Sequence, residues 1–570
     1  MLGDAGEAAV WAGVLVAALV GLGVWRLHAY GIPWWAIATV TVLVLGTLAG
    51  LAWTLRAVWP GNQARRTMRS TTEIRDMIDK DAARRGAGLR PSVASYKGTD
   101  MRQLAMQIGR IGRQKVYKSF EDFTLVFMGP RSNKTSAVAV PRILSAPGAV
   151  IATSNKPDLW ILTAWLRAKV GPVYVFDPSR IAYQPQTWWW NILADIRTVA
   201  DARRVAGHFV DAARAEGTST DREDPFFAPT GKNVLSMSLL AAALGGYTMR
   251  DVLHWIDTYS NAAVGILEMH GNQRAADALS ALLDLPGETR GGVWGEAQTA
   301  LATIQDESTL TWVTPPHTWE TQPHTAIREL NLWELFAYVP DNAPTLYLMT
   351  QEGEGSAGPV IAALVSRIFE VGDLVASAQG GRVDPPMTVV LDECANICKI
   401  DRLPQLASHL GSKSICVDAI FQSEAQTVAV WGPDRARALW GAATVRILGA
   451  GLQEYDFLTK ISGLIGTHKI RERSYSWSSQ GNTTSVQSVR EPIMPAEDIG
   501  RLKKTNALLI RQEARPVLID LVPWYTEPDS GDITECRDRA TREVQNAAVA
   551  NLGSDNPVAK ALRRGAAEST

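Results

Sequence analysis

Two long apolar runs near the amino terminus constrain the fold of this chain more than any other feature of its sequence. Residues 8–25 are all apolar, and residues 32–55 are apolar apart from threonines. Each run is close to the ~20 residues that a helix needs to cross about 30 Å of hydrocarbon. The sequence therefore predicts a membrane anchor over residues 1–59, with two transmembrane helices joined by a short turn.

The charges around these runs predict their orientation. The tail before the first run has acidic but no basic side chains, whereas four arginines follow the second run: Arg56, Arg65, Arg66 and Arg69. Basic residues favour the cytoplasmic side of a membrane, so we expect a two-pass protein with the bulk of the chain in the cytoplasm. A cleaved signal peptide is the alternative, but the basic segment that should precede its apolar run is missing.

Length and composition bound the remaining possibilities. At 570 residues the chain exceeds what one hydrophobic core usually supports. Lys plus Arg total 57 and Asp plus Glu total 58, so the net charge is -1 and any contact with DNA must be local. Cys394, Cys398 and Cys416 lie in an apolar stretch without zinc-site spacing. We expect them to be core residues in a reducing compartment.

Short apolar strands alternate with helical patterns on both sides of a helix-rich middle segment, and this alternation is typical of a parallel sheet. The expected strands are 124–128, 149–153, 172–176, 345–349, 387–391, 414–421, 444–448 and 507–510. We therefore predict an α/β fold with a linker, a discontinuous nucleotide-binding domain, an inserted all-α domain and a flexible or partly helical tail. Their respective ranges are 60–100, 101–195 with 311–526, 196–310, and 527–570.

A candidate phosphate-binding loop lies between the first of these strands and a helix. In a Walker A loop, backbone N–H groups curl around phosphates, a lysine reaches the terminal phosphates and a hydroxyl holds Mg²⁺. Against G-x-x-x-x-G-K-[ST], Lys134 and Thr135 are in place, but Met128 and Asn133 replace the two glycines. Asn133 can keep the curl, because asparagine tolerates a left-handed backbone. The residues expected to bind nucleotide are Gly129, Pro130, Arg131, Ser132, Asn133, Lys134, Thr135 and Ser136.

Polar groups follow two further strands. Strand 387–391 ends in Asp392 and Glu393, which has the form of a Walker B strand. In such sites the Asp holds hydrated Mg²⁺, and the Glu orients and deprotonates the attacking water. Strand 414–421 ends in Gln422, either a sensor of the γ-phosphate or an ordinary surface amide. Hydrolysis across a subunit boundary would also need an arginine from the neighbour, for which Arg446 and Arg471 are candidates.

Several motifs in order carry a family resemblance. They are Gly-Pro-Arg-Ser-Asn-Lys-Thr at 129–135, Val-Phe-Asp-Pro at 175–178 with Trp190-Asn191 downstream, Leu-Asp-Glu-Cys-Ala-Asn at 391–396 and Gln-Ser-Glu-Ala-Gln at 422–426. Together with the two predicted spans they resemble the TraG/TraD-type coupling proteins of type IV secretion, over about residues 14–525. The chain departs from the family at Met128 and Asn133, and at Cys394 where an aromatic is usual. These departures concern the rate of hydrolysis more than the fold.

The resemblance implies a RecA-like P-loop motor domain with an inserted all-α domain, preceded by two transmembrane helices and assembled as a homo-hexamer. It implies ATP and Mg²⁺ as cofactors, with Thr135 and Asp392 on the metal and Glu393 and Gln422 as catalytic residues. The implied partners are single-stranded DNA, the relaxase and relaxosome proteins, the type IV secretion channel and the lipid of a bacterial cell (inner) membrane.

The function expected from this resemblance is ATP-driven translocation of single-stranded DNA, with an attached relaxase, in bacterial conjugation. One alternative is a non-hydrolysing receptor that docks the substrate, which the irregular phosphate loop motivates. The other is an FtsK-like pump for duplex DNA, or an ATPase that secretes protein.

Overall fold

The computed structural model describes residues 68–215, 226–316, 327–337, 342–353, 355–478 and 481–568, with four isolated residues before position 68. The chain divides into two compact units, residues 1–68 with 466–493 and residues 69–465 with 494–570. The two predicted transmembrane helices, apart from those isolated residues, lie outside the described part. Among the described residues, no helix is long and apolar enough to span a bilayer.

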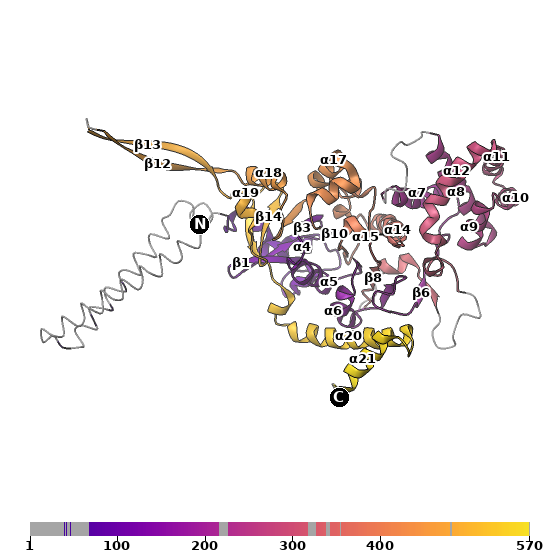
Figure 1. The fold of residues 1–570 in the computed structure, drawn as a ribbon, viewed down its shortest axis with the longest axis horizontal. Helices are drawn as coiled ribbons and strands as arrows, with labels where there is room; N and C mark the ends of the chain where they lie inside the picture. Colours follow the sequence, from indigo (N-terminus) through magenta and orange to yellow (C-terminus); the bar gives the residue numbers. More distant parts are fainter. Residues whose placement is uncertain are drawn as a thin grey trace. The chain divides into compact units, whose positions relative to one another are not determined.

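One mixed sheet forms the centre of the second unit (Figure 1). In spatial order its strands are β2 (Gln114–Lys118), β1 (Met106–Ile111), β15 (Val517–Asp520), β14 (Asn506–Arg511), β11 (Val445–Leu448), β3 (Thr124–Phe127), β10 (Ile415–Phe421), β9 (Met387–Leu391), β4 (Val150–Ser154), β8 (Thr345–Met349) and β5 (Val173–Phe176).

The sheet has a parallel part and an antiparallel part. From β11 to β5 all neighbours are parallel, which confirms the predicted parallel sheet for these strands. From β11 to β2 all neighbours are antiparallel. The sequence pattern did not distinguish this second part: residues 507–510 were predicted as a strand of the parallel sheet, whereas β14 is antiparallel to both of its neighbours. Two of the pairings in this part, β1–β2 and β14–β15, are hairpins, whose strands must run in opposite directions. The other two, β1–β15 and β11–β14, join strands that are distant in sequence.

The parallel strands are buried on both faces, which explains their continuous apolar runs. Every residue of β4, β8, β9 and β10 is buried. Strand β10 lies between β3 and β9, with Phe421 level with Phe127 and Ala419 level with Leu391. The carboxyl ends of these three strands therefore meet at one edge of the sheet.

The sheet is covered by helices and helical turns. In chain order they are η1 (Thr72–Met77), α4 (Asp79–Gly88), η2 (Met101–Gln103), η3 (Thr135–Ala139), α5 (Val140–Ser145), α6 (Asp158–Arg167), η4 (Leu332–Phe336), α14 (Gly358–Ala378), α15 (Cys394–Ile397), α16 (Leu403–Leu406), η5 (Gly411–Lys413), α17 (Glu424–Ala442), α18 (Tyr455–Ile465), α19 (Ala496–Gly500) and η6 (Trp524–Thr526). Cys394, Cys398 and Cys416 are buried free thiols within this layer and the sheet, as expected of core residues.

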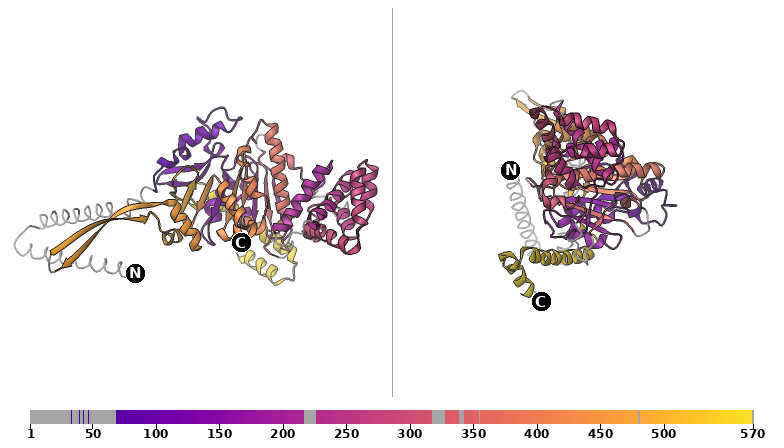
Figure 2. Two further views of the ribbon diagram at one scale, coloured as in Figure 1. Left: turned by 90° about the horizontal axis from the view of Figure 1, so that it is seen from above. Right: turned by 90° about the vertical axis from the view of Figure 1, so that its right-hand side faces the viewer.

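A group of helices interrupts the sheet between β5 and β8, and stands together at one end of this unit in the left view of Figure 2. They are α7 (Val199–Ala215), α8 (Phe227–Gly245), α9 (Met249–Asp257), α10 (Ala262–Met269), α11 (Gln273–Leu283), α12 (Gly287–Gln305) and α13 (Glu307–Leu310). Helix α7 packs against α14, which connects the group to the sheet. A short parallel pair, β6 (Trp188–Trp189) and β7 (Arg328–Glu329), joins the two chain segments that lead into and out of the group.

Two segments are more ordered than the sequence suggested. Where a flexible or partly helical tail was expected, the structure has α20 (Ser530–Leu552) and α21 (Pro557–Glu568). Helix α20 packs along α6, because Ile533, Cys536 and Ala540 recur at helical spacing and are buried. Where a linker was expected, the described part contains η1 and α4. Arg90 then forms a buried ion pair of 2.6 Å with Asp384, just before β9.

The first unit contains a long two-stranded ribbon, β12 (Thr467–Ser478) and β13 (Gly481–Pro492). The strands pair without interruption from Thr467 opposite Pro492 to Ser478 opposite Gly481. The sequence analysis did not predict this ribbon, because its residues are mostly polar and lack the apolar runs by which the buried strands were identified.

Candidate nucleotide-binding site

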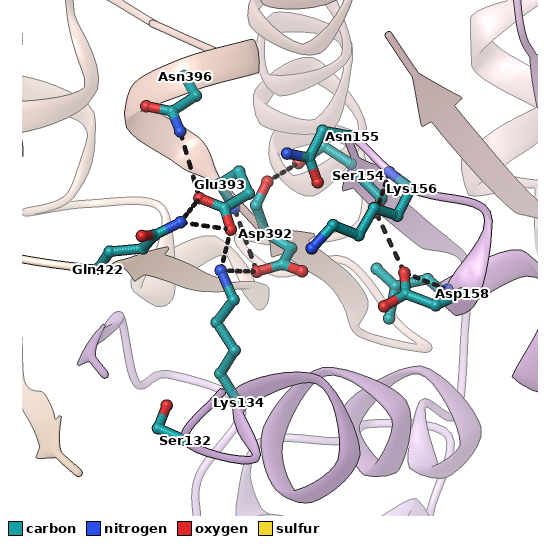
Figure 3. A network of polar contacts seen from close by, with 12 residues as sticks. Ser132, Lys134, Ser154, Asn155, Lys156, Asp158, Asp392, Glu393, Asn396 and Gln422 are labelled. Atoms are coloured by element: carbon teal, nitrogen blue, oxygen red, sulfur yellow. Dashed lines mark hydrogen bonds and ion pairs between the residues drawn. The ribbon is translucent and has the colours of Figure 1, made fainter. Parts of the chain in front are cut away.

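Four of the predicted functional residues meet at the carboxyl edge of the parallel strands. Lys134 belongs to the loop after β3, Asp392 and Glu393 follow β9, and Gln422 follows β10. Figure 3 shows the Lys134 amino group directed at the two carboxylates, with the Gln422 amide also directed at the Glu393 carboxylate. Groups separated by more than 250 residues in sequence are thus brought together by the strand order β3–β10–β9.

The phosphate loop curls in spite of its irregular sequence. Arg131 and Asn133 have left-handed backbone, with φ of 57° and 72°. Such a succession turns consecutive N–H groups towards one side and makes a concavity that suits an anion. Among the described residues, none accepts a hydrogen bond from the backbone N–H groups of residues 131–134. The curl is therefore formed, and its donors can be directed to phosphate oxygens.

The loop starts at a close contact between two stretches of backbone. Gly129 donates its N–H to the carbonyl of Ala450 at 3.0 Å. A Cβ at Gly129 would lie 2.3 Å from the carbonyl oxygen of Gly451. The glycine required here is thus Gly129, one position later than in the usual pattern. Met128 occupies the expected glycine position and is buried beneath the loop.

The other predicted loop residues lie around this curl. Ser132 is buried, and its hydroxyl donates to the carbonyl of Gly129 at 2.5 Å. Pro130 is exposed at the tip, whereas Thr135 and Ser136 are half-buried in η3, a π-helical turn that leads into α5. Asn133 donates to the hydroxyl of Tyr525 at 3.4 Å.

One ammonium group faces two buried carboxylates. The Lys134 amino group forms ion pairs with Glu393 and, at 3.5 Å, with Asp392. The three side chains are only 12%, 4% and 5% exposed, respectively. Burial raises the pKa of Asp392 to about 6, although the positive charge of Lys134 opposes the shift. Burial alone would lower the pKa of Lys134, but the charges of Asp392 and Glu393 outweigh it, and the pKa is raised. The lysine therefore stays protonated.

Glu393 is held in an unusual conformation. Its backbone is left-handed, with φ of 53° and ψ of 42°, which is uncommon for a residue with a long side chain. Gln422 donates its amide to both carboxylate oxygens at 2.9 Å. The side chain is thereby fixed beside Lys134 and Asp392, where a general base for an attacking water is required.

Further polar residues reach the same edge from β4 and β8. Burial raises the pKa of Asp158, which follows β4 and is one of the charges that raise the pKa of Asp392. Asn155 after β4 and Asn396 after Glu393 both donate to Glu352, which follows β8. The sequence analysis gave none of these four a role. The available signal was their position within five residues of the end of an apolar strand.

The arrangement suits a nucleotide with Mg²⁺. The free N–H groups of the curl and the Lys134 ammonium suit phosphate oxygens. The Thr135 hydroxyl and the Asp392 carboxylate are oxygen ligands of the kind that Mg²⁺ prefers, and one or two protein ligands suffice when phosphates supply others. The predicted residues thus form one constellation with the chemistry of a triphosphate site.

The structure describes the side chain of only one of the two candidate arginines. Arg446 on β11 is buried and donates its Nε to the carbonyl of Trp440 at 2.8 Å, with its guanidinium 5.0 Å from the Trp440 ring centre. The Arg446 side chain is thus used within its own chain, and its role towards a neighbouring subunit stays a prediction. The Arg471 side chain lies outside the described part of the chain.

Comparison with known proteins agrees with this geometry. The family model described as type IV secretory system conjugative DNA transfer matches residues 75–315. The model described as TraM recognition site of TraD and TraG matches residues 386–504. The first match contains the phosphate loop, and the second contains the acid pair and Gln422. No curated protein matches the chain.

Solved structures share the fold. Unbound TrwBdeltaN70, a bacterial conjugative coupling protein, has a TM-score of 0.53 at 18% identity, over 73% of this chain and 88% of its own. TrwB with ADP and Mg²⁺ has a TM-score of 0.50 at 16% identity, over 71% and 86%. TrwBdeltaN70 in a trigonal form with sulphate also has a TM-score of 0.50 at 16% identity, over 82% and 93%.

The fold, with its large parallel sheet, is therefore shared with TrwB, and both halves of the candidate site lie within the segments that the two family models match. The resemblance carried by the short motifs is confirmed by the two family models, and the fold shared with TrwB agrees with it. The chain belongs to the type IV coupling proteins of conjugative DNA transfer, the family of TraD and TraG.

Proposed function

We propose that this coupling protein is an ATP-driven motor that moves single-stranded DNA, with an attached relaxase, into the channel of a type IV secretion system. The observation that carries the proposal is the convergence of Lys134, Asp392, Glu393 and Gln422 at one sheet edge. A docking protein would need none of these groups in contact, whereas a hydrolase needs all of them.

The geometry suggests how binding and chemistry are linked. Lys134 is paired with Glu393 and Asp392, and a triphosphate in the curl of the loop would compete for the same ammonium. When Lys134 turns to the phosphates, Glu393 loses its cation and becomes available to accept a proton from water. Thr135 and Asp392 would hold Mg²⁺, which neutralises charge on the phosphates. Gln422, already bonded to Glu393, would then contact the γ-phosphate.

The setting of the motor belongs to the same proposal. Residues 1–59 would anchor it in the inner membrane of a bacterial cell as a two-pass protein in contact with lipid. A homo-hexamer would place a neighbour's arginine near each site and enclose a channel for DNA. TrwB, which shares the fold, is known in complex with ADP and Mg²⁺. The match to a TraM recognition site supports a relaxosome protein as partner.

The decisive experiment is ATP turnover by the full chain in lipid nanodiscs, with and without single-stranded DNA. We expect Mg²⁺-dependent turnover that rises when single-stranded DNA is added, and little turnover in Lys134→Ala. Duplex DNA of the same sequence distinguishes an FtsK-like pump, which would respond to it more strongly. Wild-type turnover no greater than that of Lys134→Ala would rule out the motor.

The non-hydrolysing docking receptor is the second candidate, because Met128 and Asn133 depart from the usual loop. It makes a different prediction for Glu393→Gln, which keeps the size of the side chain and removes the base. A motor with this change binds nucleotide and transfers no DNA. Conjugative transfer at the wild-type frequency by Glu393→Gln would favour the docking receptor.

A further inference from the structure

Tyr525 is an exposed aromatic residue beside the phosphate loop. It is 51% exposed, whereas the adjacent Trp524 is buried. Its hydroxyl accepts a hydrogen bond from Nδ2 of Asn133 at 3.4 Å. Both aromatic residues belong to η6, which packs against η3, the helical turn that follows Lys134. The ring therefore lies at the rim of the curl that suits phosphate, and about half of the residue is open to solvent.

The Tyr525 ring is oriented by its own surroundings. Its centre lies 5.7 Å from that of the Trp524 ring at an interplanar angle of 79°, an edge-to-face arrangement that aromatic pairs favour. The backbone N–H and the hydroxyl of Thr526 both donate to the carbonyl of Pro523, at 2.9 and 2.7 Å, and close the turn. A ring held in this way loses little freedom when a planar ligand contacts it.

Strand order indicates which end of a nucleotide comes near this ring. Lys134 points from the loop to Asp392 and Glu393, which follow β9 (Figure 3). In a Walker A loop the lysine reaches the β- and γ-phosphates, so the terminal phosphates belong on the side of β9. Strands β11, β14 and β15 lie on the opposite side of β3. The nucleoside end is therefore expected on the side of these three strands.

Tyr525 approaches the loop from that side. Strand register places Phe127, Leu448, Leu508 and Leu518 level with one another, from β3 through β11 and β14 to β15. Because Leu518 is near the end of β15, this strand ends at the edge of the sheet where the phosphate loop begins. The chain then continues into η6. An aromatic ring is thus placed where the phosphate loop meets the nucleoside side of the sheet.

We propose that the Tyr525 ring is the surface on which the base of the bound nucleotide stacks. The inference deepens the proposed function and rests on its nucleotide site. Every base has a π-face, so an aromatic ring recognises a planar base without reading its edge. Adenine and guanine nucleotides should therefore depend on the ring alike. Loss of such a ring weakens binding about tenfold, which corresponds to about 1.4 kcal/mol.

The test compares a nucleotide with an anion that carries three phosphates and no base. The probes are the Mg²⁺ complexes of imido-ATP, which is not hydrolysed, and of inorganic tripolyphosphate, each titrated calorimetrically into the full chain in lipid nanodiscs. Tyr525→Leu should lower the affinity for imido-ATP about tenfold and leave that for tripolyphosphate within about twofold. Tyr525→Phe keeps the ring, so both affinities should stay within about twofold of the wild type.

Further measurements make the test specific to the base. The imido analogue of GTP should lose the same factor as imido-ATP in Tyr525→Leu, because stacking does not read the edge of the base. Tyr455→Leu removes a tyrosine on α18 that is 67% exposed, and it should change neither affinity. Binding of single-stranded DNA, measured by fluorescence anisotropy, should be the same for Tyr525→Leu and the wild type. Thermal denaturation checks that each variant is folded.

The outcomes separate this inference from the proposal beneath it. If the wild type binds neither probe, the nucleotide site is absent, and the stacking role falls together with the motor. If Tyr525→Leu weakens both probes equally, the ring acts only by holding the loop through Asn133, and stacking is overturned. Unchanged affinities in Tyr525→Leu, or a loss confined to DNA, overturn it as well. A loss for the nucleotides alone, with Tyr525→Phe like the wild type, supports stacking even if DNA does not stimulate turnover.

Discussion

On the loop side of the site, the groups that can face a nucleotide are mostly backbone N–H groups, whereas on the strand side they are side chains. The loop depends on the left-handed backbone of Arg131 and Asn133 and on the close approach at Gly129. The strand side depends on the carboxylates of Asp392 and Glu393. Lys134 pairs with both, and Gln422 donates to Glu393. A backbone site tolerates changes of side chain as long as the curl is kept. This explains how the loop can depart from the usual pattern while the acid pair does not.

The comparison predicts the largest loss on the strand side. Asp392→Asn should lower ATP turnover by about 10²-fold or more, because it removes a charged ligand of Mg²⁺. The stability of the nucleotide-free protein should not fall with it, since burial disfavours the charged form of Asp392. Turnover and melting temperature, measured on the same sample, test both parts. Asp555→Asn, at a fully exposed side chain (100%), is the control. A strongly destabilised Asp392→Asn would contradict the comparison.

The loop side should respond most to a change in backbone contact. Gly129→Ala puts a methyl group 2.3 Å from the Gly451 carbonyl oxygen, so one backbone segment must move. We expect a loss of about 1–3 kcal/mol in the free energy of unfolding, together with weaker nucleotide binding. Gly463→Ala on α18 has open space at its Cβ and serves as the matched control. Equal melting temperatures for the two variants would show that the contact is not required.

The two sides should also differ in their response to pH. The pKa of Asp392 is about 6 in the folded protein, above its ordinary value of 3.8, so the folded state holds an extra proton between these two pH values. The raised pKa of Asp392 therefore stabilises the folded state at low pH, and this stabilisation is lost as the pH rises from 3.8 towards 6. Mg²⁺ needs the ionised carboxylate, so its affinity should fall about tenfold for each pH unit below 6. Asp392→Asn is the reference for the pH dependence of stability and of Mg²⁺ affinity. Titration of the nucleotide itself affects the wild type and this variant equally.

If the slope of wild-type affinity against pH equalled that of Asp392→Asn, the metal would not depend on this carboxylate. A loop made of backbone groups has no corresponding titration. Lys134 stays protonated throughout, since the neighbouring carboxylates raise its pKa.

The sequence could predict the parallel strands and the residues at their ends, because buried strands leave continuous apolar runs. The range 387–391 agrees with β9 at both ends, and 414–421 differs from β10 by one residue. It could not predict that β10 lies between β3 and β9, since strand order depends on packing between distant segments. For that reason Glu352 and Asn155 were missed, although each lies within three residues of the end of a predicted strand. Local pattern does not show that the two strands are neighbours.

Apart from β14, which was expected at 507–510, the antiparallel strands were missed for another reason, and so was the length of α20. Strand β2 and the ribbon of β12 and β13 are largely polar. The buried residues of α20 are few and widely spaced along a charged segment, so they resemble a solvated tail. Such elements depend on what they pack against, and that information is not local.

The smallest expected effect concerns Asn133, where backbone and side chain can be separated. With φ of 72°, Asn133→Ala should cost about 1 kcal/mol, whereas Asn133→Gly should leave nucleotide affinity within about twofold. Tyr525→Phe removes only the hydroxyl that accepts the Asn133 amide, so it measures the side-chain contact by itself. Affinity and turnover of the three variants can be compared directly. A tenfold rise in turnover for Asn133→Gly would mean that the loop limits hydrolysis in the natural chain. In that case Asn133, in place of the usual glycine, would slow hydrolysis in the natural chain. The docking receptor would then gain support.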